Sequence, residues 1–288
     1  MATNILSPIT SLIPFISAEQ AASMAYPPNA LPGGRDVPTF YGNMRVYEWG
    51  PLDGEKVMFV HGDATPSLVF SKIAQALVDA NYRVMLFVLF GPAGLLRTLP
   101  AGYDNPILLN PESAPSQEAI RDKVQEVLGV SPSGPALAIS ESAHPVPPLV
   151  FPPAVNQTYD LAALLQWQFD HNEGHVHAFQ QSVKHGPLQN QEDVWAKVCD
   201  IFAGKSHPES PLYNSTLLVY FGDEDNIVFG KETNEDILKL LPANHLKVEY
   251  VPGGHSFPYP NSEKISQDLI SFWGSHITKL YIPVQLQE

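Results

Sequence analysis

Apolar runs alternate with a helical pattern over residues 38–99. Residues 56–61 and 82–90 are short apolar runs, typical of strands buried in a parallel sheet. Between them, residues 67–80 carry apolar side chains at helical spacing. Strand, helix and strand in this order predict a βαβ unit and therefore parallel pairing. A hairpin at the edge of the sheet is predicted over residues 39–49, where a Gly-Asn pair supplies the turn.

The same alternation returns near the C-terminus. Residues 216–221 and 246–251 are predicted strands, and residues 232–241 and 262–273 are predicted helices. The two ends of the chain therefore contribute to one α/β core with a mostly parallel sheet.

The middle of the chain follows a different pattern. Prolines and small residues recur over residues 100–153, with one predicted helix at 116–128. Residues 154–179 and 190–202 predict further helices, and no strand alternation stands out. We therefore expect a helical cap inserted into the core.

Four segments follow from these patterns. They are a poorly ordered leader (1–37), the N-terminal part of the core (38–99), a proline-rich and helical cap insertion (100–202) and the C-terminal part of the core (203–288).

Composition narrows the class of partner. The 288 residues are 44% hydrophobic, which is enough for a sizeable core, and the formal net charge is −14. A surface of this sign repels phosphate backbones, so we expect no nucleic-acid partner. The single cysteine, Cys199, excludes an internal disulfide, and we expect a reduced, partly buried thiol.

Hydropathy predicts neither a membrane span nor a secretory signal. No apolar run approaches the roughly 20 residues that a membrane helix needs. The mildly apolar stretch at residues 5–18 is interrupted by Pro8 and Pro14, and no Lys or Arg precedes it. We expect a cytoplasmic protein.

Three groups of candidate site residues follow predicted strands, at the carboxyl ends where open α/β sheets place their sites. They are His61, Gly62 and Asp63; Asp223 and Asp225; and His255 after Gly253 and Gly254. A His-Gly turn can direct backbone N–H groups at a developing oxyanion, an acid can orient an imidazole, and a loop histidine can act as a general base. Taken singly, each is better explained as an ordinary turn or strand-end residue. Their order along the chain indicates descent from a sheet that bears a catalytic triad.

In this order the residues resemble the α/β-hydrolase fold family, which contains lipases, esterases, epoxide hydrolases and carbon–carbon bond hydrolases. The resemblance covers residues 40–97 and 217–273, with 154–202 similar to the family's cap. It implies that Asp225 is the acid, with Asp223 as second choice, and that His255 is the base. It also implies an oxyanion hole from the N–H of Asp63 or Ala64 in the turn at His61 and Gly62, a small apolar or ester-like substrate, and no cofactor or metal.

The family's nucleophile is missing from this sequence. Gly-x-Ser-x-Gly and Gly-x-Asp-x-Gly do not occur. Residues 84–87 resemble the start of the family's fourth strand, and residues 88–96 resemble the end of its sixth. Two helices, two strands and their loops amount to roughly 55 residues, so we infer that the central strands are missing and that 87 and 88 mark the joint.

The missing segment can have three causes and two consequences for the sheet. A true deletion, a splice form and a gene-model error all fit the sequence. Either residues 84–90 fill the gap in the sheet, or unpaired strand edges, at roughly 1–3 kcal/mol per buried group, leave the domain weakly folded.

Other residues are poor substitutes for the missing nucleophile. Ser142 follows a short apolar run but lacks the glycines of a strained turn, and Ser67 is better explained as a helix N-terminal residue. The histidines 171, 175 and 177 match no fixed metal-ligand spacing.

We therefore expect a relative of ester hydrolases with impaired or absent activity. A non-enzymatic interaction protein or an unstable variant is the alternative, and a metal-dependent hydrolase is the weaker one. The oligomeric state is not predicted by the sequence.

Overall fold

The computed structural model describes most of the chain from residue 30 onward. The described residues are 17, 19–20, 24, 26–27, 30–39, 42–60, 67–87, 94–110, 114–128, 149–150, 158–159, 161–171 and 174–280.

The N-terminal part of the core forms a four-stranded sheet in the order β1-β2-β4-β3. Its elements are β1 (Gly34–Thr39), β2 (Gly42–Trp49), β3 (Glu55–Val60), the 3-10 helix η2 (Ser67–Phe70), α3 (Ser71–Asp79) and β4 (Tyr82–Phe87). β1, β2 and β4 pair antiparallel in succession, and β4 pairs parallel with β3. The predicted βαβ unit is therefore confirmed. A hairpin is present as well, but the Gly42-Asn43 pair is not its turn, because both residues lie in β2 and pair with Thr39 and Pro38 of β1.

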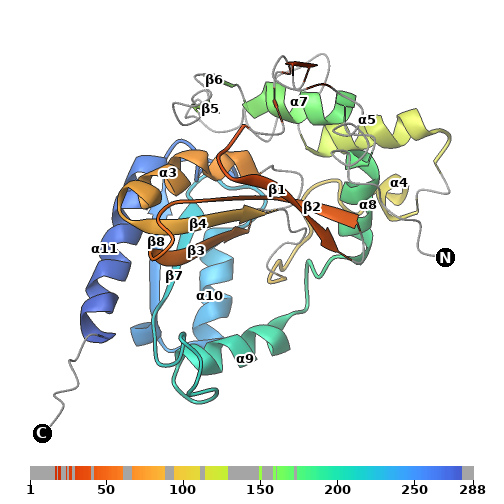
Figure 1. Cartoon of the computed structure of the whole chain (residues 1–288). Coiled ribbons are helices and arrows are strands. Elements are labelled where there is room, and N and C mark those ends of the chain that lie inside the picture. The colour runs from red at the N-terminus through yellow and green to blue at the C-terminus, as the bar shows by residue number, and fades with distance from the viewer. Residues whose placement is uncertain are drawn as a thin grey trace, which may run out of the picture.

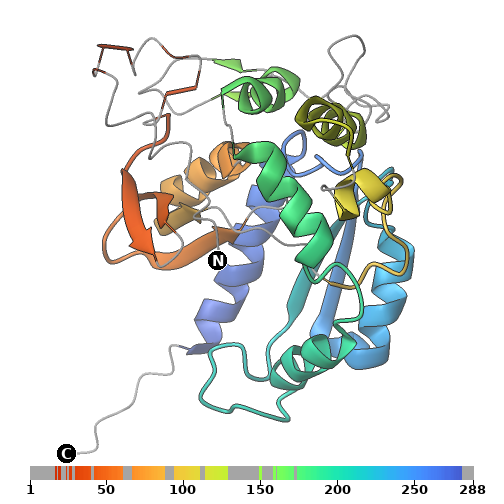
Figure 2. The ribbon, with the colours of Figure 1, turned by 90° about the vertical axis from the view of Figure 1, so that its right-hand side faces the viewer.

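The C-terminal part supplies a parallel pair of strands, β7 and β8. Its elements are β7 (Leu217–Gly222), α10 (Gly230–Leu240), the 3-10 helix η4 (Ala243–His245), β8 (Leu246–Val251) and α11 (Ser262–Leu280). Figure 2 shows α10 on one face of this pair and α11 on the other. The four elements predicted here are confirmed.

The described residues in the middle of the chain are mostly helical, as predicted. It contains α4 (Pro106–Leu109), α5 (Gln117–Val127), β5 (Leu149–Val150), β6 (Thr158–Tyr159), α7 (Leu161–His171), α8 (His175–His185) and α9 (Glu192–Phe202). The single helix expected over residues 154–179 is wrong, because α8 begins a new helix after Gly174, its N-cap. Glycine in a helix interior costs about 1 kcal/mol relative to alanine, which favours a break at this position.

One hydrophobic core joins the two sheets. Leu77 of α3 and Leu86 of β4 lie in the same buried cluster as Tyr259 and Ile265 from the C-terminal part. In Figure 1, α3 and α11 lie side by side, and they make one of the most extensive contacts between helices. A second cluster holds α5, α7 and α8 together, so the cap has its own core.

The leader predicted over residues 1–37 ends earlier than the sequence suggests. Ala30 and Leu31 are each only 1% exposed and belong to the core that joins the sheets, and β1 begins at Gly34. The expectation of a poorly ordered segment is therefore wrong for residues 30–37. Their short apolar pair among prolines and glycines has no periodicity, so tertiary burial alone reveals its role.

The two sheets are not joined by hydrogen bonds between the strands that the structure describes. Within that part of the chain, β3 pairs with β4 alone and β7 pairs with β8 alone. β4 lies between β2 and β3, so its described residues do not fill a gap beside β7. Figure 1 shows β7 and β8 running across the direction of β3 and β4.

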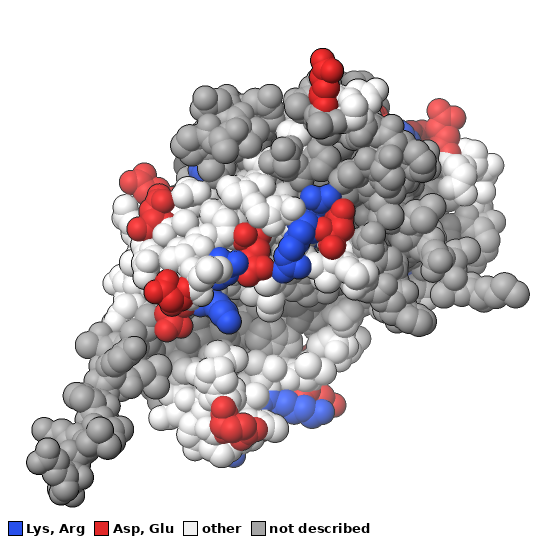
Figure 3. Space-filling view, viewed as in Figure 1, with Lys and Arg blue, Asp and Glu red and all other residues white. Residues whose placement is uncertain are grey.

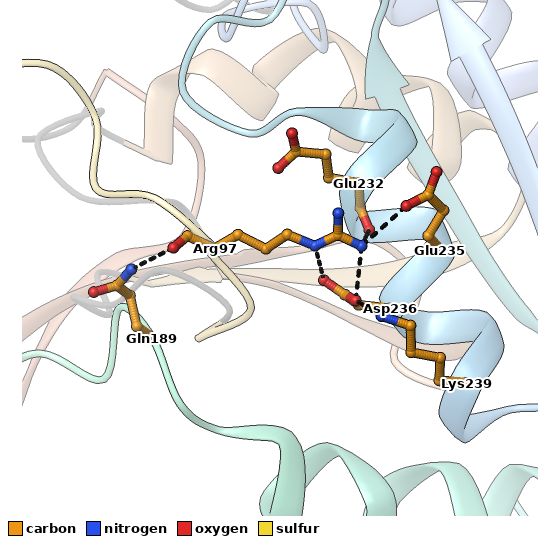
Figure 4. Close-up of polar contacts among 6 residues, drawn as sticks. All are labelled: Arg97, Gln189, Glu232, Glu235, Asp236 and Lys239. Carbon is orange, nitrogen blue, oxygen red and sulfur yellow. Dashed lines mark hydrogen bonds and ion pairs between the residues drawn. The ribbon is translucent and has the colours of Figure 1, made fainter.

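The segments on either side of residues 88–93, which lie outside the described residues, contact different parts of the molecule. Before this point, β4 pairs within the first sheet. After it, Leu96 N donates to Leu188 O at 3.3 Å and Leu95 is buried against α9 and α10. Arg97 anchors the segment to α10 through the Asp236 carboxylate at 2.6 Å (Figure 4). The predicted joint at 87 and 88 falls at the edge of the described residues.

Opposite charges lie close together on the surface of the described part of the chain. Figure 3 shows acidic and basic side chains next to one another on the face over β1 and β2, where Glu48 bridges Arg35 and Arg83. No described helix is both long and apolar enough to cross a membrane. Cys199 is fully buried rather than partly buried, and burial raises the pKa of its thiol.

Candidate functional site

The turn after β7 brings a carboxylate to the carboxyl end of the sheet. A side chain at Gly222 would place its Cβ 2.3 Å from Gly253 O, so only glycine lets the two turns approach so closely. Asp223 Oδ1 accepts a hydrogen bond from Gly253 N at 2.9 Å, and Asp223 N donates to Val251 O at 2.9 Å. Asp223 therefore ties the β7 turn to the β8 turn.

Asp225 lies in a cradle of backbone donors. Its Oδ1 accepts from Ile227 N at 2.8 Å and from Val228 N at 2.9 Å, which is an Asx turn. The side chain is only 3% exposed. Burial raises the pKa of this carboxyl, but hydrogen bonds from His255, Val228 and Ile227 outweigh it, and the pKa is lowered overall.

The turn after β8 brings His255 to this carboxylate. Its Nδ1 lies 3.0 Å from Asp225 Oδ2, and its side chain is 38% exposed. Gly253, two residues earlier, has φ of 118°, a conformation that favours glycine. An ionised carboxylate can only accept, so the imidazole donates from Nδ1 and keeps its lone pair on Nε2.

The structure thus distinguishes the two acids that the sequence left open. Asp225 contacts His255, whereas Asp223 bonds to the backbone of Gly253. The sequence offered a turn-forming role as the ordinary explanation of Asp225, and the two backbone hydrogen bonds show that it has this role as well as the contact with His255.

Several predicted site residues lie outside the described residues. They are His61, Gly62, Asp63 and Ala64 of the predicted oxyanion turn, and Ser142. Ser67 is the first residue of η2 and is 5% exposed, in agreement with its interpretation as a helix residue.

The histidines of the cap point to different surroundings. His171 stacks on Trp167 with ring centroids 4.8 Å apart, and its Nδ1 lies 3.1 Å from Trp167 O. His175 is buried edge-on against Phe169, and His177 is exposed. No three metal-binding side chains gather among the described residues. These three histidines therefore give no support to the metal-dependent alternative.

The overall arrangement matches solved structures closely enough to classify the fold. A candidate aryl esterase from Burkholderia cenocepacia superposes with a TM-score of 0.54 at 14% identity, over 85% of this chain and 99% of that protein. A 2-hydroxy-6-oxo-6-phenylhexa-2,4-dienoate hydrolase from Rhodococcus superposes with a TM-score of 0.51 at 12% identity, over 83% of this chain and 98% of that protein. The chain has an α/β-hydrolase fold.

Comparison of structures finds proteins with this fold, whereas comparison of the whole sequence with known proteins does not. A serine hydrolase from Cycloclasticus zankles superposes with a TM-score of 0.50 at 10% identity, over 84% of this chain and 98% of that protein. No protein-family model and no curated protein matches the sequence. At such identities, this likeness establishes the α/β-hydrolase fold alone.

Proposed function

We propose that this chain is an ester-hydrolase relative that has kept the acid and base of a Ser-His-Asp relay and lost the serine. The observation that carries the proposal is the pair of Asp225 and His255, 3.0 Å apart, on the turns after β7 and β8. Acid before histidine is the chain order of α/β-hydrolases. On this basis catalysis is impaired or absent.

The pair has the chemical properties that the relay needs. The lowered pKa of Asp225 keeps it charged at neutral pH, so it can stabilise the imidazolium that forms when His255 takes a proton. The two backbone donors hold the carboxylate in place and thereby fix the orientation of the imidazole. The His255 side chain is 38% exposed, so part of the imidazole is accessible from outside.

The arrangement of the strands supports loss of the segment that would hold the nucleophile. Neighbouring strands of a sheet rotate by about 20–25° relative to one another, so strands that run across each other belong several positions apart. β3 and β7 have this relation but no described strand between them. Two missing central strands, with the nucleophile turn at the tip of the first, would account for both features.

The substrate class follows from the open pair and from the neighbours. For any activity that remains, we propose a small apolar or ester-like substrate and a reaction without cofactor or metal. The structural neighbours include a candidate aryl esterase and a serine hydrolase, which supports this class. The acidic net charge of −14 supports the absence of a nucleic-acid partner.

An ester assay with a serine-directed probe tests the proposal. Purified protein is incubated with p-nitrophenyl butyrate, and separately with a fluorophosphonate that labels activated serines. We expect no labelling and a rate no more than roughly 10³–10⁴-fold above that in water, the residue left when a triad loses one member. Labelling of one serine with turnover on the order of 10 s⁻¹ would show an intact relay and contradict the proposal.

The competing function is a non-enzymatic interaction protein. It is favoured by β3, which pairs with β4 alone among the described strands and whose Met58 side chain is 62% exposed. A chain that shows no His255-dependent hydrolysis but forms a stable complex with another protein would support this second candidate.

A further inference from the structure

We propose that the His255 imidazole is itself the nucleophile of a residual activity toward esters with aryl leaving groups. The proposal rests on the role proposed above for the Asp225–His255 pair and adds a reaction that needs no serine. Its basis is a contrast between the two ring nitrogens of His255. Nδ1 faces a buried carboxylate, whereas Nε2 makes no hydrogen bond to any group that the structure describes.

Comparison with the other histidines shows what is particular to this pair. His207 Nδ1 also lies 3.0 Å from a carboxylate, that of Glu209, but the two side chains are 65% and 74% exposed. His245 Nδ1 lies 2.9 Å from a carbonyl oxygen, that of Ser215. Of the histidines whose side chains the structure describes, His255 alone places Nδ1 on a buried carboxylate.

Burial of the carboxylate changes the chemistry of the ring. An exposed ion pair is screened by water and holds neither partner in a fixed geometry. Asp225 is fixed by two backbone donors and faces the ring from a site with little water, where its charge acts more strongly. The proton is therefore held on Nδ1, and Nε2 presents its lone pair to solvent as a nucleophile of fixed direction.

The proposed first step is acyl transfer to the ring. The Nε2 lone pair attacks the ester carbonyl carbon, and the carbonyl π electrons move to oxygen. Collapse of this tetrahedral species breaks the bond to the aryl oxygen, and the phenolate leaves with the electron pair. The product is an N-acyl imidazolium, whose positive charge lies beside the Asp225 carboxylate through Nδ1–H.

The second step regenerates the imidazole with water as the only co-reactant. Water attacks the acyl carbon and loses a proton to solvent, the bond from carbon to Nε2 breaks with its electrons returning to nitrogen, and the acid departs. The sum is ester plus water giving acid plus phenol. Alkyl esters are excluded, because an alkoxide leaves less readily than imidazole and the tetrahedral species reverts to the ester.

Hydrolysis of p-nitrophenyl acetate by the full chain, pretreated with fluorophosphonate, tests the proposal. The variants are His255→Ala, His255→Gln and Asp225→Asn, with His207→Ala as the matched control. We expect both His255 variants to lose the protein-dependent rate and Asp225→Asn to lower it by about 10²-fold. The control should keep the rate of the unmodified chain, and ethyl acetate should not be hydrolysed.

Trapping identifies the intermediate. Hydroxylamine added during turnover converts the acyl-imidazole to acetohydroxamate, and because it also cleaves p-nitrophenyl acetate directly, the product is measured relative to a protein-free sample. The unmodified chain and His207→Ala should give more acetohydroxamate than that sample, whereas His255→Gln should not. Far-UV circular dichroism and the urea midpoint of each variant show whether it is folded. His255→Gln keeps a donor for Asp225, so a loss of trapping in a folded variant reports chemistry rather than unfolding.

Three outcomes would overturn the proposal, and they are distinguishable from failure of the proposed function. Equal loss in His207→Ala and His255→Ala would mean that any surface imidazole suffices. Absence of His255-dependent turnover would overturn the nucleophilic role and leave the impaired relay standing. Inactivation by fluorophosphonate with labelling of a serine would overturn both.

Discussion

His175 is a buried histidine whose ring packs against an aromatic side chain. It lies on α8, is 6% exposed, and packs edge-on against Phe169 with ring centroids 4.8 Å apart. Its Nε2 is buried and has no hydrogen-bond partner among the residues that the structure describes. Burial lowers the pKa of His175 to about 4 from an ordinary value of 6.5, so the ring is neutral in the folded protein at neutral pH.

This burial predicts a loss of stability at mildly acidic pH. As pH falls from about 6.5 to 4, the unfolded chain protonates His175 before the folded chain does, so the free energy of unfolding falls. The shift corresponds to roughly 3 kcal/mol in all. Urea midpoints at pH 7 and pH 4.5 should therefore fall less in His175→Leu than in the unmodified chain.

The matched control is His177→Leu, two residues along the same helix and exposed. It should keep the pH dependence of the unmodified chain. A pH profile that His175→Leu leaves unchanged would mean that other groups cause the acid sensitivity.

At the scale of single residues, the sequence predicted which side chains approach each other but not how. Asp225 and His255 were identified from their order and their turns. The preference for Asp225 over Asp223 rested on a resemblance, and the hydrogen bonds supply its physical basis. Asp223 and Asp225 are only two residues apart, and His255 lies 30 residues after Asp225. The conformation of the folded turn therefore decides which of the two carboxylates faces the imidazole.

Among the elements, β3 differs most from what its sequence pattern led us to expect. Its apolar run predicts a strand of the parallel sheet, yet the Met58 side chain is 62% exposed and β4 is the one described strand that pairs with β3. An apolar strand with an open edge is a template for pairing with another chain. The structure therefore predicts self-association through β3.

A charge at this edge should weaken that association. Met58→Lys should shift the chain toward the monomer in light scattering at high concentration, because lysine on an edge strand opposes pairing. Its effect on the free energy of unfolding should stay within about 0.5 kcal/mol, as for other exposed positions.

Leu52→Lys is the control, since Leu52 is 81% exposed but lies in the turn before β3. Equal effects of the two substitutions would show that general surface polarity, rather than the strand edge, governs association.

Helix boundaries follow from local chemistry more directly than strand pairing does. Ser116 caps α5 by accepting from Ala119 N at 3.1 Å, at the helix start that the sequence predicted. The break at Gly174 was visible as a glycine but was placed within a longer helix, because the apolar positions on either side continue the same periodicity. Strand partners depend on distant segments, and no local pattern encodes them.

Packing of side chains, rather than hydrogen bonds between the described strands, connects the two sheets of the core. α11 and α3 pack across the two sheets, and Ile265 of α11 is 5% exposed within their shared core. The sequence left open that unpaired strand edges make the domain weakly folded, and this expectation concerns stability, which unfolding experiments can test. A core that spans both sheets favours cooperative unfolding in spite of the divided sheet.

Truncation of this shared core should destabilise both halves together. Ile265→Ala should lower the free energy of unfolding by about 2–5 kcal/mol, the usual cost of a large-to-small change in a core. Urea unfolding followed by tryptophan fluorescence and by far-UV circular dichroism should give coincident single transitions in the unmodified chain and in the variant.

Val194→Ala on the exposed face of α9 should leave the midpoint nearly unchanged, because Val194 is 52% exposed. Two separate transitions in the unmodified chain would mean that the sheets unfold independently and that the shared core does not couple them.

The sequence by itself determined the alternation of strands and helices, the helical cap, and the order of acid and base on turns after strands. Periodicity and turn chemistry act over a few residues, so these features are encoded locally. Tertiary structure decided that Ala30 and Leu31 belong to the core and that Asp225 rather than Asp223 holds His255. It also decided that the described strands of the core form two sheets, which pack together through α3 and α11. Each of these depends on contacts between segments far apart in the chain, where packing rather than local preference sets the lowest free energy.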